Sequence, residues 1–253
     1  MSTIARPTQE ATERVTRRPP VRSPRRRGAW PLDLYRSAVG KKYVMALTGI
    51  VLMGYVLVHM LGNLKLYLGA ESLNAYAEYL RVLGEPALPR EGLLWIARVV
   101  LLVCFVLHLH AAYALTMINR RARPEGYRQK RHYIASSFAS RTMRWSGVIV
   151  LLFVVFHLLD LTWGVANPGY VEGDAYRNTV ASFERWPVAV AYIVANLALA
   201  VHLFHGAWSL FQSMGWNSAR FNHWRRYFAV AFAAIIAVGN VSFPIAVLAG
   251  VVS

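Results

Sequence analysis

Six histidines lie within long apolar stretches of this sequence: His59, His108, His110, His157, His202 and His205. Ionisable side chains are costly in a stretch that crosses a membrane, so they usually serve a purpose there. Four separate stretches each offer at least one imidazole. A helical bundle can use four imidazoles to hold two haems, because each iron takes two axial nitrogens from facing helices. The alternative is that these histidines form hydrogen bonds between helices.

The depth of each histidine in its stretch indicates how the imidazoles pair. A helix rises roughly 1.5 Å per residue, which puts His59 and His157 about 25 and 20 Å from the basic edge of their stretches. By the same rise His110 lies about 15 Å from that edge and His202 about 21 Å, a depth similar to that of His157. We predict an outer pair, His59 with His157, and an inner pair, His110 with His202.

Two of the stretches carry a second histidine, which leaves the inner ligands open. His108 and His110 lie two residues apart and face different sides of a helix, so only one of them can serve a given site. His202 and His205 lie three residues apart and share a face. Either of these two could bind one centre, or one could bind while the other handles protons.

The elements that position these histidines follow from the hydropathy pattern. Of the 253 residues 56% are hydrophobic, and the charges gather between long uncharged stretches. The pattern predicts an all-α, polytopic membrane protein with five transmembrane helices, at about 43–67, 93–118, 146–166, 187–213 and 227–251. The single cysteine, Cys104, excludes a disulfide within the chain and an iron–sulfur site built from its own cysteines.

The charge distribution predicts the topology. The net charge of +16 comes from Lys and Arg beside the apolar stretches, which indicates contact with anionic lipid rather than nucleic acid. Basic segments precede the first span and follow the second and fourth, and the alternate loops are acidic or mixed. Because basic loops stay in the cytoplasm, we expect a cytoplasmic N-terminus and an outside C-terminus in the plasma (inner) membrane. Residues 1–29 read as a flexible basic arm before a transmembrane domain over 30–253, and a short surface helix is expected over 72–80.

Short motifs in or beside the first four spans resemble those of a known family. They are LVHMLGN at 57–63, HAAYA at 110–114, SRTM at 140–143, FHL at 156–158 and HLFHGAWS at 202–209. Together with five spans of this polarity, their order resembles the single-subunit cytochrome b membrane anchor of succinate dehydrogenases and fumarate reductases (respiratory complex II). The resemblance covers nearly all of the chain beyond the arm.

The resemblance implies a set of cofactor-binding residues. Two haems b would be held by His59, His110, His157 and His202, with His108 and His205 as alternates at the inner centre, which could also be another metal centre. Haem propionates need cationic partners near span ends, where Arg98 lies, and the SRTM motif adds Ser140 and Arg141 to that role.

The function implied is that of an anchor at the quinone end of an enzyme complex. A flavoprotein subunit and an iron–sulfur subunit would dock on the basic face, and electrons would pass into the membrane to reduce a quinone. The chain has no flavin-binding motif, so the succinate chemistry would belong to those partners. Alternatives are a free-standing dihaem cytochrome b and, with Arg98 and Asp160 on an ion path, a proton-coupled transporter.

Two places could hold the quinone, which needs an apolar, aromatic slot with hydrogen-bond donors. The cytoplasmic mouth offers Ser37, Lys42, Tyr43, Trp208 and Gln212, and the outer end offers Arg98, Asp160 and Trp163. Asp160 and Arg98 come at similar depth. We expect them to pair, because charges within a membrane tend to find each other.

Overall fold

The computed structural model describes residues 30–122, 138–216 and 218–253, and these form helices joined by turns, with no strand among them. Five segments are long and apolar enough to cross a membrane: Ala38–Leu68, Gly92–Arg121, Thr142–Thr162, Trp186–Ser213 and Asn222–Leu248. The prediction of an all-α protein with five transmembrane helices is confirmed. The arm predicted over 1–29 and the stretch 123–137 of the second loop lie outside the described residues.

The helices follow one another in a simple order. They are α2 (Trp30–Arg36), α3 (Ala38–Asn63), η1 (Leu64–Leu68), α4 (Ala70–Val82), α5 (Gly92–Arg121), α6 (Phe138–His157), η2 (Leu158–Thr162), α7 (Ala175–Phe183), α8 (Trp186–Ser213), η3 (Ala219–Phe221) and α9 (Asn222–Leu248). The η2 segment is a π-helical turn that continues α6. The surface helix expected over 72–80 is present as α4.

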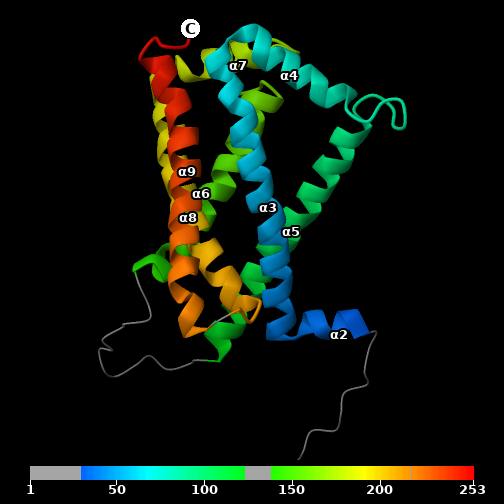
Figure 1. Cartoon of the computed structure of the whole chain (residues 1–253), viewed down its shortest axis with the longest axis vertical. Coiled ribbons are helices and arrows are strands. Elements are labelled where there is room, and N and C mark those ends of the chain that lie inside the picture. Colours follow the sequence, from blue (N-terminus) through cyan, green and yellow to red (C-terminus); the bar gives the residue numbers. More distant parts are fainter. Residues whose placement is uncertain (1–29, 123–137, 217) are drawn as a thin grey trace, which may run out of the picture.

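The long helices run between two ends of the bundle (Figure 1). One end carries α2, and we call it the α2 end. The other carries α4, α7 and the C-terminus, and we call it the α7 end. The chain crosses the molecule once with each of α3, α5, α6, α8 and α9.

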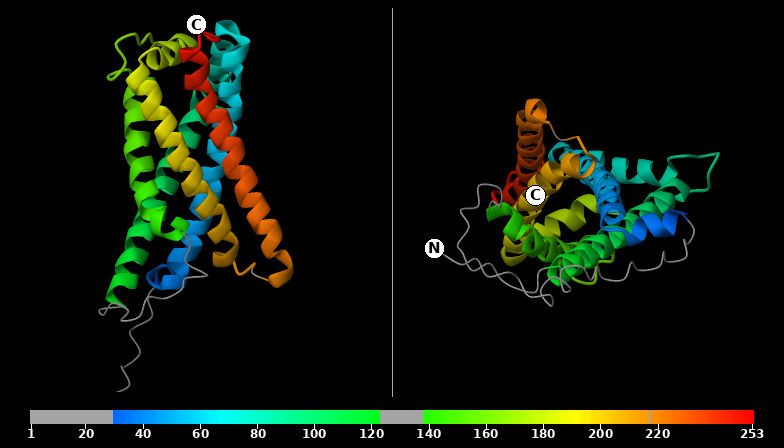
Figure 2. Two further views of the ribbon diagram at one scale, coloured as in Figure 1. Left: turned by 90° about the vertical axis from the view of Figure 1, so that its left-hand side faces the viewer. Right: turned by 90° about the horizontal axis from the view of Figure 1, so that it is seen from below.

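The bundle is built from two helix pairs and a fifth helix. Helix α3 packs along α5, α6 packs along α8, and α9 lies mainly against α8 (Figure 2). Small buried residues such as Ala207 in α8 and Ala229 in α9 permit close approach of helices, as is typical in membranes. The Asn240 side-chain amide donates to the Asn196 side-chain oxygen at 3.0 Å, a polar link of the kind that joins helices in lipid.

The corner between α2 and α3 depends on a glycine. The Ser37 hydroxyl accepts from the Gly40 amide at 2.9 Å and donates to the Leu34 carbonyl at 2.7 Å, which caps α3. A Cβ atom on Gly40 would lie 1.9 Å from the Leu34 carbonyl oxygen. Only a residue without a side chain lets α2 turn back so tightly against the start of α3.

We expect the substitution Gly40→Ala to move α2 and to destabilise the protein by about 1–3 kcal/mol, as overpacking does. The free energy of unfolding in detergent measures the effect. Gly54→Ala is the matched control on the same helix, because a Cβ there meets nothing within 4 Å and alanine is the better helix former. Equal stabilities of the two variants would contradict the close approach at Gly40.

A hydrogen-bonded joint fastens α4 to α7 at the α7 end. Asp174 caps α7 by accepting from the Arg177 amide at 3.0 Å, and it also accepts from the Asn74 side chain of α4 at 2.9 Å. The Asn74 oxygen in turn accepts from the Tyr176 amide at 3.0 Å. These bonds, first that from the Arg177 amide and then that from Asn74, hold the pKa of Asp174 below its ordinary value of 3.8.

The joint should therefore weaken in acid. A carboxyl group whose pKa is lowered by folding stabilises the fold above its unfolded pKa and loses this contribution as the pH falls through the folded pKa. We expect the exchange protection of the Arg177 amide to drop as the pH falls below 3.8, measured by hydrogen–deuterium exchange. Asp174→Asn keeps an acceptor but no titratable group, so its protection should not change in the same range.

Candidate functional site

Four histidines form two facing pairs inside the bundle. His59 of α3 faces His157 of α6, with ring centroids 5.9 Å apart and ring planes at 90°. His108 of α5 faces His202 of α8, with centroids 6.4 Å apart and planes at 64°. Among the described residues, α3 and α6 are not closely packed, and neither are α5 and α8. The imidazoles thus meet across gaps between the two helix pairs.

Both separations suit a metal held between two imidazoles. A metal ion that binds an imidazole nitrogen at roughly 2.0–2.1 Å on two opposite sides holds the ring centroids about 6 Å apart. The residues described contain no group of three or more His, Cys, Asp or Glu side chains placed for a metal. Each pair therefore offers two protein ligands, which is the number that a haem iron takes besides its porphyrin.

Hydroxyl groups on the neighbouring helices hold the rings of His108 and His202. The Thr48 hydroxyl lies 3.3 Å from Nδ1 of His108, and the Ser146 hydroxyl lies 3.4 Å from Nδ1 of His202. Each hydroxyl donates its one proton to a carbonyl of its own helix: Thr48 to Val44 at 2.7 Å, Ser146 to Met143 at 3.0 Å. At the imidazole the hydroxyl can then only accept, so Nδ1 carries the proton and Nε2 is left for a ligand.

The same short pattern of residues recurs in α3 and α6. Methionine, a hydroxyl residue, glycine and histidine follow at equal spacing: Met45, Thr48, Gly49 and His59, then Met143, Ser146, Gly147 and His157. The glycines face the rings, since a Cβ on Gly49 would lie 3.6 Å from His108 and one on Gly147 3.4 Å from His202. Each of these helices therefore gives one histidine to the pair near the α7 end and one hydroxyl to the pair near the α2 end. The sequence analysis missed this repeat, and with it Thr48 and Ser146.

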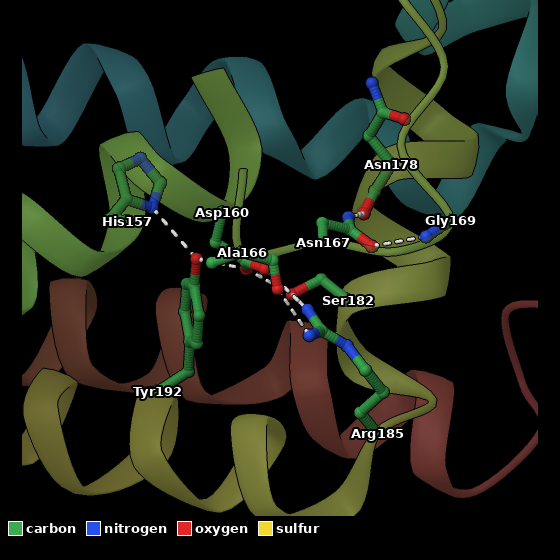
Figure 3. Close-up of polar contacts among 9 residues, drawn as sticks. All are labelled: His157, Asp160, Ala166, Asn167, Gly169, Asn178, Ser182, Arg185 and Tyr192. Carbon is green, nitrogen blue, oxygen red and sulfur yellow. Dashed lines mark hydrogen bonds and ion pairs between the residues drawn. The ribbon is translucent and has the colours of Figure 1, made fainter. Parts of the chain in front are cut away.

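A buried network supports His157 (Figure 3). The Tyr192 hydroxyl lies 3.4 Å from Nδ1 of His157 and donates to Asp160 at 2.9 Å. Asp160 is fully buried and also binds Ser182 and Arg185, the guanidinium at 2.5 Å. The expected pair between Asp160 and Arg98 is thus wrong. The partner is Arg185, because the π-helical turn places Asp160 beside the start of α8.

Arg98 also lies at the α7 end of the bundle, but it does not contact Asp160. It is 3.9 Å from Glu91, and its guanidinium stacks 4.8 Å from the Trp95 ring. In α3, Tyr55 stacks on His59 with ring centroids 5.4 Å apart. Arg98 therefore remains a cation at the same end of the bundle as the His59–His157 pair.

The two remaining histidines do not join the pairs. His110, expected opposite His202, is exposed and contacts the Tyr35 hydroxyl and ring. The structure places His108 in that position instead, because residues two apart on a helix point in different directions. His205 packs against the Phe204 ring, and its Nε2 has no hydrogen-bond partner in the described part of the chain.

The other predicted site residues are spread over the α2 end. Ser140 and Arg141 lie in the first turn of α6, and their side chains are outside the described set. Among the quinone candidates, Ser37 caps α3. The side chains of Lys42, Tyr43 and Gln212 are exposed. The Trp208 ring lies under the guanidinium of Arg225, at 4.6 Å. Within residues 30–122, 138–216 and 218–253, no hydrogen bond or ring contact joins the candidates of α3 to those of α8.

A comparison with family models finds a match that lies mostly in the second half of the chain. Residues 119–241 match the family described as succinate dehydrogenase/fumarate reductase transmembrane subunit. The matched stretch contains His157 and His202 but begins in the last turn of α5, so it does not include His59 or His108, the partners of these two histidines. Comparisons with curated proteins and with solved structures find no match. Over just under half of its length, the chain is similar to succinate dehydrogenase/fumarate reductase transmembrane subunits, and its five helices able to cross a membrane agree with this family of membrane anchors.

Proposed function

We propose that this chain docks the flavoprotein and iron–sulfur subunits of a succinate:quinone oxidoreductase, binds two haems b and forms the quinone end of the complex. The family match supports the anchoring role. The observation that carries the haem assignment is the two facing histidine pairs, with a hydroxyl group beside Nδ1 of three of the four rings.

The ligand assignment differs from that implied by the motifs at one position. We assign His59 and His157 to the haem near the α7 end, and His108 and His202 to the haem near the α2 end. Bound haem b supplies one-electron transfer. The protein would hold the rings, fix the tautomers of His108 and His202 through Thr48 and Ser146, and offer Arg98 as a cation for a propionate.

The distribution of charge supports a cytoplasmic α2 end. Among the described residues this end is mainly basic, with Arg36, Lys41, Lys42, Arg120, Arg121, Arg220 and Arg226 against the acid Asp33. The α7 end is mixed, with Glu71, Glu78, Glu85, Glu172, Asp174 and Glu184 beside Lys65, Arg81, Arg90 and Arg177. Basic segments stay on the cytoplasmic side of the inner membrane. The same basic surface suits docking of the iron–sulfur subunit.

We place the quinone at the α2 end, where docked partners would deliver electrons. The exposed side chains of Lys42, Tyr43 and Gln212 and the ring of Trp208 offer donors and an aromatic wall there. His110, which the haem pairs do not use, lies at the same end with Tyr35. A quinone site needs such polar groups beside apolar surface.

The two alternatives have less support. A transporter site is typically built on helices that break near the membrane midplane, whereas α3, α5 and α8 are continuous and the proline within α9, Pro244, lies close to its end. A free-standing dihaem cytochrome b would use the same histidines, but the family match favours a subunit of a complex.

Affinity purification through a tag on this chain tests the proposal. We expect a flavin-containing protein and an iron–sulfur protein to copurify from native membranes, with succinate-dependent reduction of a quinone analogue. A chain that purifies alone, with haem and without either partner, would instead identify a free-standing cytochrome.

A further inference from the structure

Asp160, next to His157 in space, is the centre of a buried hydrogen-bond network. Asp160 has no exposed surface and accepts hydrogen bonds from Ser182, Arg185 and Tyr192. Arg185 is itself fixed, because it also donates to the Ala166 carbonyl at 2.7 Å. A buried carboxylate is tolerated when it is paired and hydrogen-bonded in this way.

The direction of the hydrogen bonds determines what Tyr192 can do at His157. A tyrosine hydroxyl has one proton, and a carboxylate can only accept. Tyr192 donates to Asp160 at 2.9 Å, so at 3.4 Å from His157 Nδ1 its oxygen can only act as an acceptor. His157 must then carry its proton on Nδ1, and its Nε2 keeps the lone pair that binds a metal.

The backbone after His157 has the geometry that brings Asp160 to Tyr192. The residues after His157 form a π-helical turn, Leu158–Thr162, and such turns often occur at functional sites. In a regular α-helix the residue three positions after His157 would point along nearly the same face. The wider turn brings Asp160 against Tyr192 of α8 and Ser182 of α7 instead (Figure 3).

Among the described residues, the pair near the α2 end, His108 and His202, has no carboxylate behind its hydrogen-bond acceptors. There the acceptors are the hydroxyls of Thr48 and Ser146, which donate to main-chain carbonyls. At His157 the acceptor is a hydroxyl bound to a carboxylate, which is a stronger electron donor toward the ring. The protein therefore supports its two centres with different chemistry.

We propose that Asp160, acting through the Tyr192 hydroxyl, is a positioning residue that holds His157 in its Nδ1–H form and raises the basicity of Nε2 at the centre near the α7 end. This inference rests on the proposed function for the identity of the bound group, but the tautomer of His157 is a property of the chain alone. With haem bound there, a more basic His157 would favour the oxidised iron, so the network would lower the reduction potential of that centre relative to the other.

The test uses the full chain with its copurifying subunits and the variant Tyr192→Phe. Loss of a hydrogen-bond partner of a ligating histidine typically changes metal affinity about 10–100-fold. A tenfold loss confined to the oxidised form raises the potential by about 59 mV for a one-electron couple. In a redox titration followed by absorbance, we expect one haem to shift upward and the other to stay in place.

Two variants serve as controls. Tyr176→Phe removes another tyrosine hydroxyl at the same end, one that donates to the Ser253 carbonyl at 3.0 Å, and should shift neither potential. If Tyr192→Phe does not fold, Asp160→Asn keeps the shape and an acceptor for Tyr192 while removing the charge, and should shift the same haem in the same direction. A folded Tyr192→Phe protein with both potentials unchanged, or both shifted equally, would overturn the proposal.

A second readout separates this inference from the haem assignment. If the purified protein contains no haem, the haem assignment fails, and ¹⁵N spectra of labelled histidines then report the tautomer of His157 directly. We expect an Nδ1–H ring in the native chain and a mixture of tautomers in Tyr192→Phe. The same mixture in both proteins would show that Tyr192 only packs against His157.

Discussion

Replacing His108 with alanine should remove one of the two haems, whereas replacing His110 with alanine should leave both in place. His108 faces His202 at a ring separation of 6.4 Å, while His110 points to Tyr35 at the edge of the bundle. An iron with two axial histidines loses half of its protein ligands with either member of the pair. Haem content per chain, measured by pyridine haemochrome against protein concentration, should fall by half in His108→Ala.

Two further variants complete this test. His202→Ala should give the same loss as His108→Ala, and His205→Ala should keep both haems, since His205 packs against Phe204. The opposite pattern, with haem lost in His110→Ala and retained in His108→Ala, would restore the ligand assignment implied by the sequence motif and reject the pairing in the structure.

Replacing Asp160 with alanine should destabilise the protein more than any exposed charge change. Removing one partner of a buried ion pair typically costs about 3–5 kcal/mol, because the other charge is left without compensation. The side chain of Arg185 is 29% exposed, so water can relieve part of that cost and the lower end of the range is expected. Chemical denaturation in detergent measures the loss in the free energy of unfolding. The haem content that remains at each denaturant concentration is a second signal.

Glu91→Ala is the matched control for that measurement. Glu91 also pairs with arginines, Arg81 and Arg98, but its side chain is 35% exposed and the distances are 3.6 and 3.9 Å. Partly exposed pairs of this kind contribute about 0–1 kcal/mol. If Asp160→Ala were no more harmful than Glu91→Ala, the network would be a surface feature rather than a buried joint.

The architecture could be predicted from the sequence because hydropathy is a property of whole segments. Five stretches long enough to cross a bilayer stand out from the charged loops, and all five are present as helices. The short helix α4 also follows from its local sequence. Segment length and composition determine these features before any packing is known.

The details of the site depended on helix rotation, which composition does not determine. His108 and His110 are equally deep for practical purposes, and only the packing of α5 on α3 decides that His108 faces inward. The repeat in α3 and α6 was hidden because a threonine in one copy is a serine in the other. Its meaning appears only when Thr48 and Ser146 are seen beside histidines of other helices.

The partner of Asp160 was mispredicted for a related reason. Arg98 and Asp160 have similar depth in their own spans, but depth says nothing about the side of the bundle on which a residue lies. Arg185 belongs to a polar turn between α7 and α8, outside the spans, and the π-helical turn after His157 brings Asp160 to it. Neither the turn nor the contact has a simple sequence signal.

The most direct test of the account is a reduced-minus-oxidised absorbance spectrum of the purified protein, with haem quantified per chain. Two bis-histidine sites require about two haems b per chain, with the spectrum of low-spin, six-coordinate iron. That result would support both histidine pairs as ligands. A preparation that retains flavin and iron–sulfur partners but contains no haem would contradict the account, and would leave the chain as an anchor whose histidine pairs serve another purpose.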